Sequence, residues 1–214
     1  MLKNIPSIIK KQIVAITGLG LVLFLIAHLA GNMLIYVGAE AFNAYAEALH
    51  NLGPLLWVAR IGLIVTFLVH ISFTAVLVLE NRKARTQGYA VNKDHTDKKS
   101  IAVRLMPITG SILILYVVLH LIDFTFKDKS IYANGLYELV TDTLMNPIHA
   151  IWYMVAMACV GFHLSHGIQS VAQTFGVNTR NTLPKIQKAS LALGLLIAIG
   201  FGSIPLYIML TMNL

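Results

Sequence analysis

The stretch Ile13–Val37, IVAITGLGLVLFLIAHLAGNMLIYV, decides how this chain folds. It contains no Asp, Glu, Lys or Arg, and it exceeds the roughly 20 apolar residues that a helix needs to cross a bilayer. It is also longer than the apolar core of about 7–15 residues in a secretory signal peptide, so we expect a retained membrane helix. His28 lies within it, and an ionisable ring inside a membrane helix points to a function.

Four further apolar stretches carry the same signal. Together the five predict helices at about residues 13–37, 55–79, 105–126, 147–175 and 189–212. The composition agrees, because 57% of the 214 residues are hydrophobic and only 12% are charged, which is too little charge for a soluble domain. We therefore expect an all-α fold, an integral membrane bundle of five transmembrane helices that forms a single domain over residues 1–214.

The net charge of +7 does not indicate a nucleic-acid partner, because the basic residues lie between the apolar stretches, where they orient membrane helices. They gather before the first helix, between the second and third, and between the fourth and fifth. The positive-inside rule then places the N-terminus in the cytoplasm and the C-terminus outside. The single cysteine, Cys159, excludes an intrachain disulfide and a cysteine-held iron–sulfur cluster.

A short repeat links the first and third helices. The sequence ITG occurs at residues 16–18 and again at 108–110, and in both helices a histidine follows ten residues after the glycine, at His28 and His120. The second and fourth helices carry a matching His-x-Ser sequence at nearly the same offset. The first two helices and the next two are therefore interpreted as two copies of one helical hairpin.

The depths of four histidines sort them into two pairs. His28 and His120 lie about 15 residues along helices that run outward, which is about 22 Å at 1.5 Å per residue. His70 and His163 lie equally far along helices that run inward. The prediction is an outer pair, His28 and His120, and an inner pair, His70 and His163, each able to hold one haem.

Other roles are open to membrane histidines. A lone histidine often forms an interhelical hydrogen bond, and a transition-metal site usually adds carboxylates or thiolates. No carboxylate lies at these levels, since Asp123 is near the outer end of its helix. Two neutral imidazoles suit a haem iron used for electron transfer. Thr17 and Thr109, each followed by a glycine, fall about where an inner haem would pass.

His166 is the main rival of His163 as the inner ligand. It lies three residues further along the same helix, and the repeat places Phe73 opposite it. We therefore prefer His163. His50 and His149 are expected at the outer membrane surface.

Two runs carry a resemblance to a known family. They are TGLGLVLFLIAHL at residues 17–29 and FHLSHGIQSVAQTFG at residues 162–176. They resemble the cytochrome b subunit of succinate:quinone oxidoreductases, in particular the type with five helices, two haems and a single membrane subunit. The likeness extends over essentially the whole chain. It implies two haem b groups, with the ligands His28, His70, His120 and His163.

The resemblance also implies partners and a location. The subunit would lie in a bacterial cytoplasmic membrane, in contact with lipid, and anchor a flavoprotein subunit and an iron–sulfur subunit on the cytoplasmic side. It would pass electrons between them and a membrane quinone, usually menaquinone. The inner haem would face the iron–sulfur partner and the outer haem the quinone. The chain has no flavin or nucleotide fingerprint, so dicarboxylate chemistry would belong to other subunits.

Two groups of residues are candidates for further roles. Glu47 and His50, a turn apart at the outer surface, are the hypothesis for a proton-exchanging quinone site. Basic residues of the cytoplasmic side could dock the partners or pair with haem propionates, namely Arg104, Arg180 and Lys185. Two alternatives stay open: a di-haem cytochrome b of a hydrogenase or formate dehydrogenase, and a haem-free transporter or assembly factor.

Overall fold

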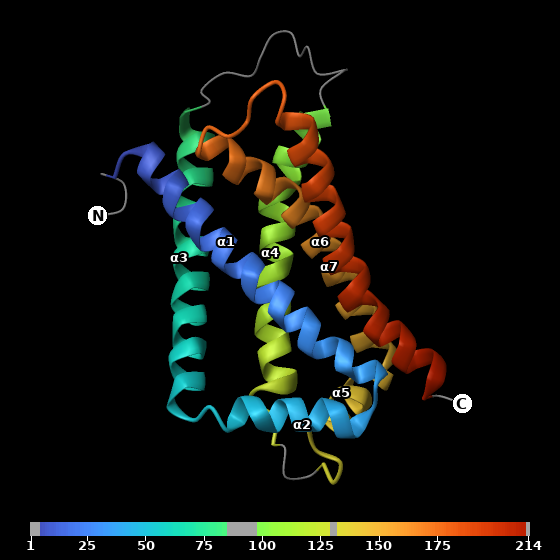
Figure 1. Ribbon diagram of the computed structural model, residues 1–214. Helices are drawn as coiled ribbons and strands as arrows, with labels where there is room; N and C mark the ends of the chain where they lie inside the picture. The colour runs from blue at the N-terminus through green and yellow to red at the C-terminus, as the bar shows by residue number, and fades with distance from the viewer. Residues whose placement is uncertain (1–4, 85–97, 129–131, 213–214) are drawn as a thin grey trace.

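The computed structural model describes residues 5–84, 98–128 and 132–212, and every regular element within these ranges is helical (Figure 1). Five of the described helices are long and apolar enough to cross a membrane, as predicted. The elements are α1 (Ser7–Asn32), the 3-10 helix η2 (Met33–Tyr36), α2 (Ala39–His50), α3 (Pro54–Ala84), α4 (Lys98–Phe124), α5 (Gly135–Met145), α6 (Pro147–Thr174) and α7 (Leu183–Thr211).

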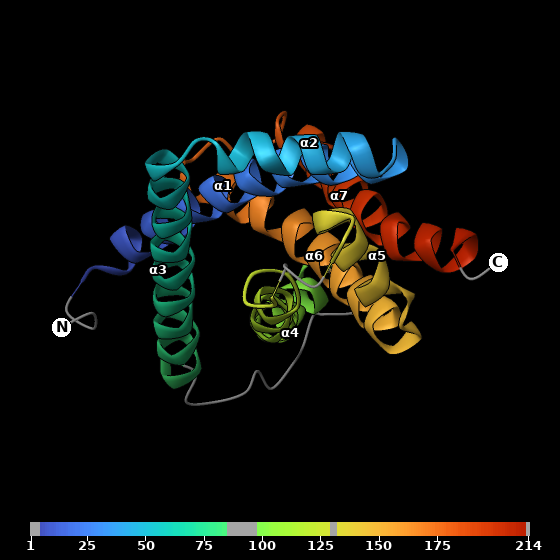
Figure 2. The same ribbon diagram turned by 90° about the horizontal axis from the view of Figure 1, so that it is seen from below.

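The membrane helices pack as a connected series. Helix α3 lies against α1, α1 against α6, and α6 against both α4 and α7. The two hairpins, α1 with α3 and α4 with α6, therefore meet through α1 and α6. Figure 2 shows α3 and α4 standing apart from each other, with α1 and α6 linking them.

The closest packing in the bundle is between α6 and α7. A Cβ atom added to Gly194 would lie 2.6 Å from the carbonyl oxygen of Gly161, so only glycine allows the two backbones to approach this closely. Helix α3 is the opposite case, because none of its residues is buried in the described structure. The bundle is thus compact around α6 and open around α3.

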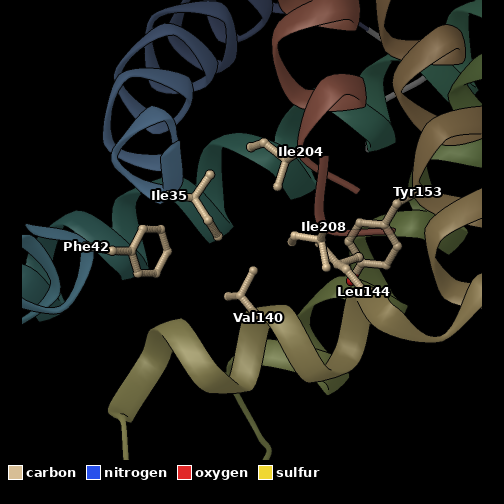
Figure 3. Packing of buried hydrophobic residues seen from close by; sticks show 7 residues of the cluster. All are labelled: Ile35, Phe42, Val140, Leu144, Tyr153, Ile204 and Ile208. Carbon is tan, nitrogen blue, oxygen red and sulfur yellow. The ribbon is translucent and has the colours of Figure 1, made fainter. Parts of the chain in front are cut away.

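Two short helices close one end of the bundle, where the sequence had predicted only loops. α2 and α5 lie across this end (Figure 1), and Asn43 joins them by donating to the carbonyl of Asn134 at 2.7 Å. Both bury one face, and Figure 3 shows Phe42 and Val140 within the hydrophobic cluster that also contains Ile208 of α7. The prediction missed them because amphipathic helices of 11 and 12 residues give no span-length apolar signal.

The other end of the bundle holds a partly buried ion pair. Lys10 of α1 donates to both carboxylate oxygens of Glu80 of α3, and Lys10 is only 2% exposed. From the sequence alone Lys10 counted as an orientation signal. The structure shows that it also links α1 to α3, two turns before Thr17.

Candidate functional site

The predicted outer histidines come together in the structure. His28 of α1 and His120 of α4 have ring centroids 6.0 Å apart, with the ring planes at 86°. A metal bound between two imidazoles needs a nitrogen–metal distance of about 2 Å and about 1 Å from nitrogen to ring centre on each side, or about 6 Å in total. The spacing of these two rings fits a single iron atom held between them.

Aromatic side chains enclose the outer pair. Phe24 stacks on His28 with centroids 5.1 Å apart, and Phe201 of α7 approaches the same ring to 5.6 Å. The ring of His120 has three such neighbours at 5.2 to 6.1 Å, namely Tyr116, Phe124 and Tyr153. These rings line the pair with apolar surface.

The outer rings have little hydrogen bonding. Nδ1 of His120 is buried and has no hydrogen-bond partner among the described residues. The amide nitrogen of Asn32 lies 3.4 Å from Nδ1 and 3.5 Å from Nε2 of His28, at the long limit for a hydrogen bond. That amide instead donates to the His28 carbonyl at 2.8 Å. Packing, rather than polar contacts, holds these two rings.

The inner histidines are held by the ITG repeat. Nδ1 of His70 lies 3.2 Å from Oγ1 of Thr17, and Nδ1 of His163 lies 3.2 Å from Oγ1 of Thr109. The two hairpins therefore repeat the same contact, in which the threonine of the outward helix meets the histidine of the inward helix. The sequence had placed these threonines near the inner level, but only the structure shows their contact with the rings.

The glycine that follows each threonine lies directly against the histidine ring. A Cβ added to Gly18 would lie 3.2 Å from Cε1 of His70, and one added to Gly110 would lie 3.6 Å from Cε1 of His163. The first of these distances is tighter than ordinary van der Waals contact. Each imidazole thus rests against a helix backbone, and at Gly18 a side chain would press on the ring of His70.

His166 lies on α6 three residues after His163. His166 lacks the threonine contact in the described structure. It lines a small hollow between α4 and α6 together with Leu105, Met106, Thr109, Phe162 and Ser165. This supports the preference for His163 as the inner residue.

The outer pair fits a haem held by two histidines, and the inner rings are the candidates for a second one. The ligands of the outer pair come from separate helices at iron-spanning distance, and the inner rings are oriented against glycine backbones. Within residues 5–84, 98–128 and 132–212, no three His, Cys, Asp or Glu side chains converge as a conventional metal site.

The predicted quinone residues lie on α2. Glu47 and His50 are exposed and one helical turn apart at the end of that helix. A second group lies closer to the outer histidines, where the hydroxyl of Tyr153 donates to Asp123 at 2.8 Å. Nε2 of His149 lies 3.7 Å from the same carboxylate, whose side chain is 16% exposed.

Asp123 and His149 were seen in the sequence only as separate surface residues. The packing of α4 against α6 brings them together, and no sequence spacing predicts that contact. Of the three basic candidates, Arg180 and Lys185 are exposed where α6 leads into α7. The side chain of Arg104 lies outside the described residues.

Comparison with known proteins identifies the family of the chain. The family described as the succinate dehydrogenase/fumarate reductase transmembrane subunit matches residues 79–202, a range that contains His120 and His163. The succinate dehydrogenase cytochrome b558 subunit of Bacillus subtilis (strain 168) is 26% identical over 184 residues, which are 86% of this chain and 86% of that protein. No solved structure matches the chain significantly. The chain, with five apolar helices long enough to span a membrane, belongs to the succinate dehydrogenase/fumarate reductase transmembrane subunit family.

Proposed function

We propose that the protein is the di-haem cytochrome b anchor of a succinate:quinone oxidoreductase, which carries electrons between an iron–sulfur subunit and a membrane quinone. The observation that carries this proposal is the outer pair, two imidazoles from separate helices 6.0 Å apart in an aromatic enclosure. A haem held by two histidines would supply one-electron transfer and would leave no open position for oxygen.

Different residues of the chain would hold the outer haem and the inner haem. His28 and His120 hold the outer site, and their aromatic neighbours exclude water from it. His70 and His163 hold the inner site, with Thr17 and Thr109 against their rings. The fixed helix framework keeps both sites at constant separation, which suits electron transfer between them.

The charge distribution supports the orientation. Lys11, Arg82 and Lys83 lie at the end of the bundle where α1 begins and α3 ends, and Arg180 and Lys185 lie at the same end (Figure 1). The opposite end carries the acidic residues of α2 and α5, namely Glu40, Glu47, Glu138 and Asp142. The proposal places the basic end in the cytoplasm, where the flavoprotein and iron–sulfur subunits dock near the inner haem.

The quinone, which we propose to be menaquinone, would react at the opposite end. Glu47 and His50 are the proposed proton-exchanging pair on α2. Asp123 with His149 is a second candidate, favoured because Tyr153 connects this carboxylate with the ring of His120. A carboxyl group beside an imidazole can exchange protons with a quinone.

Family membership favours this proposal over a hydrogenase or formate dehydrogenase subunit and over a haem-free transporter or assembly factor. The test is purification of the chain from its native membrane with a pyridine haemochrome assay and identification of the proteins that accompany it. We expect two b-type haems per chain and a flavoprotein with dicarboxylate activity. Absence of b-type bands, or co-purification with a hydrogenase instead, would contradict the proposal.

A further inference from the structure

The hydroxyl groups of Thr17 and Thr109 each have three polar neighbours. Oγ1 of Thr17 lies 2.7 Å from the Ile13 carbonyl oxygen, 3.2 Å from the Val14 carbonyl oxygen and 3.2 Å from Nδ1 of His70.

The second hairpin repeats this arrangement. Oγ1 of Thr109 lies 3.0 and 3.1 Å from the carbonyl oxygens of Leu105 and Met106, and 3.2 Å from Nδ1 of His163. Two copies of the same geometry, in separate hairpins, make a chance contact a poor explanation.

The donors and acceptors can be assigned by counting protons. A threonine hydroxyl has one hydrogen, and in a helix it commonly donates that hydrogen to the carbonyl three or four residues earlier. Carbonyl oxygens cannot donate, so the hydroxyl oxygen keeps its lone pairs for the ring. Nδ1 of the histidine must then carry the hydrogen and donate it to the threonine.

That assignment determines the other ring nitrogen. A neutral imidazole with hydrogen on Nδ1 has a lone pair on Nε2, which is the form that binds a metal. A hydrogen bond from the opposite nitrogen also raises the basicity of a ligating histidine. The outer pair lacks this arrangement, since Nδ1 of His120 has no partner in the described structure and the Asn32 amide nitrogen, 3.4 Å from Nδ1 of His28, can only donate.

We propose that Thr17 and Thr109 are positioning residues that fix His70 and His163 as Nδ1–H tautomers and, by accepting from Nδ1, make the inner haem harder to reduce. The inference rests on the proposed function, because it requires that the inner pair bind a haem. It adds a residue role to each hairpin and a physical difference between the two haem sites. The more basic ligand stabilises the ferric state, so loss of the hydrogen bond favours reduction.

The test is a redox titration of the haem-loaded protein in four variants. T17V and T109V keep the side-chain shape but remove the oxygen, while T17S and T109S keep the oxygen. We expect each valine variant to shift the reduction equilibrium of one haem about tenfold toward the reduced form, or about 59 mV for a one-electron couple. The serine variants should stay close to the unmodified protein.

The haem whose midpoint potential shifts should be the same haem that the H163A variant lacks. A matched control is T66V in α3, because Thr66 donates to the Gly62 carbonyl in the same way but has no described ring partner. The T66V variant should leave the midpoint potentials of both haems unchanged. Electron paramagnetic resonance of the ferric haems gives a second measurement, in which only the inner signal should move in T17V and T109V.

Each outcome separates the inference from the proposed function. A protein without b-type haem would contradict the proposed function itself. Two haems with unchanged midpoints in both valine variants would overturn the inference alone, as would equal shifts in valine and serine variants. Selective loss of the inner haem in T17V, with retention in T17S, would support it, and loss in both would count against it.

Discussion

The inner and outer histidine pairs use the same ligand type in different surroundings. The inner rings meet threonine hydroxyls, with Nδ1–Oγ1 distances of 3.2 Å in both hairpins. The outer rings lie 6.0 Å apart among aromatic side chains, and Nδ1 of His120 has no described partner. One pair is oriented by hydrogen bonds and the other by packing.

This difference teaches that the two hairpins are copies only in part. The ITG repeat supplies a threonine and a glycine to each inner ring, so the inner site inherits the symmetry of the repeat. The outer site lies beside α7, which has no counterpart in the repeat and contributes Phe201. Two histidine pairs with different surroundings can thus arise from one duplicated unit.

Replacement of Gly18 by valine should have the largest effect, because it acts directly on an inner ring. Its Cβ would lie 3.2 Å from Cε1 of His70, and the added methyl groups require the ring to move. We expect G18V to lose the inner haem and keep the outer one, measured by haem quantitation per chain. G62V is the control, because nothing lies within 4 Å of that Cβ position. Two haems in G18V would mean that the ring is not held against α1.

Removal of the ion pair at the inner end should have the next largest effect. The variant E80Q leaves the ammonium of Lys10 buried without its partner, which costs about 3 kcal/mol, the low end for a buried pair because Glu80 is 36% exposed. We expect the inner haem to be lost at a lower temperature than the outer one, followed by absorbance on heating. The double variant K10M/E80M should recover much of the stability. Heat resistance in E80Q equal to that of the unmodified protein would refute a structural role for the pair.

Substitutions at the proposed quinone end test whether protons are exchanged beside the outer site. Asp123 accepts from Tyr153, whose ring approaches His120, so D123N should lower quinone-linked turnover about a hundredfold while both haems remain. The paired variant E47Q/H50Q on α2 examines the other candidate in the same assay. A larger loss in E47Q/H50Q than in D123N would assign proton exchange to α2.

Replacement of Asn32 should have the smallest effect on the haems. Its amide lies 3.4 Å or more from the ring nitrogens of His28, so N32L should change the reduction equilibrium of the outer haem less than about threefold. A redox titration of N32L beside T17V makes the comparison direct. A shift as large as that in T17V would show that the outer pair is also tuned by a hydrogen bond.

The sequence predicted what depends on periodicity and spacing. The five spans follow from apolar length, and the meeting of His28 with His120 follows from equal depth on helices of the same direction. Thr17 and Thr109 were placed near the inner level because eleven residues at 1.5 Å each put them about 16 Å below the outer histidines, on nearly the same helix face.

Contacts set by helix packing could not be predicted in this way. Lys10 and Glu80 are 70 residues apart, and the facing of their side chains depends on where α1 crosses α3. The same is true of Asp123 and His149, which meet only because α4 packs on α6. α2 and α5 were missed because their stability comes from burial against the bundle end.

The most direct test of the account is haem quantitation in H28A, H120A, H70A and H163A, with redox titration of the haem that remains. We predict one haem per chain in each variant, with the same haem missing from H28A and H120A and the other missing from H70A and H163A. H166A should keep both. Two haems retained in any of the four variants, or the same haem missing from H28A and H70A, would contradict the pairing of histidines at two levels.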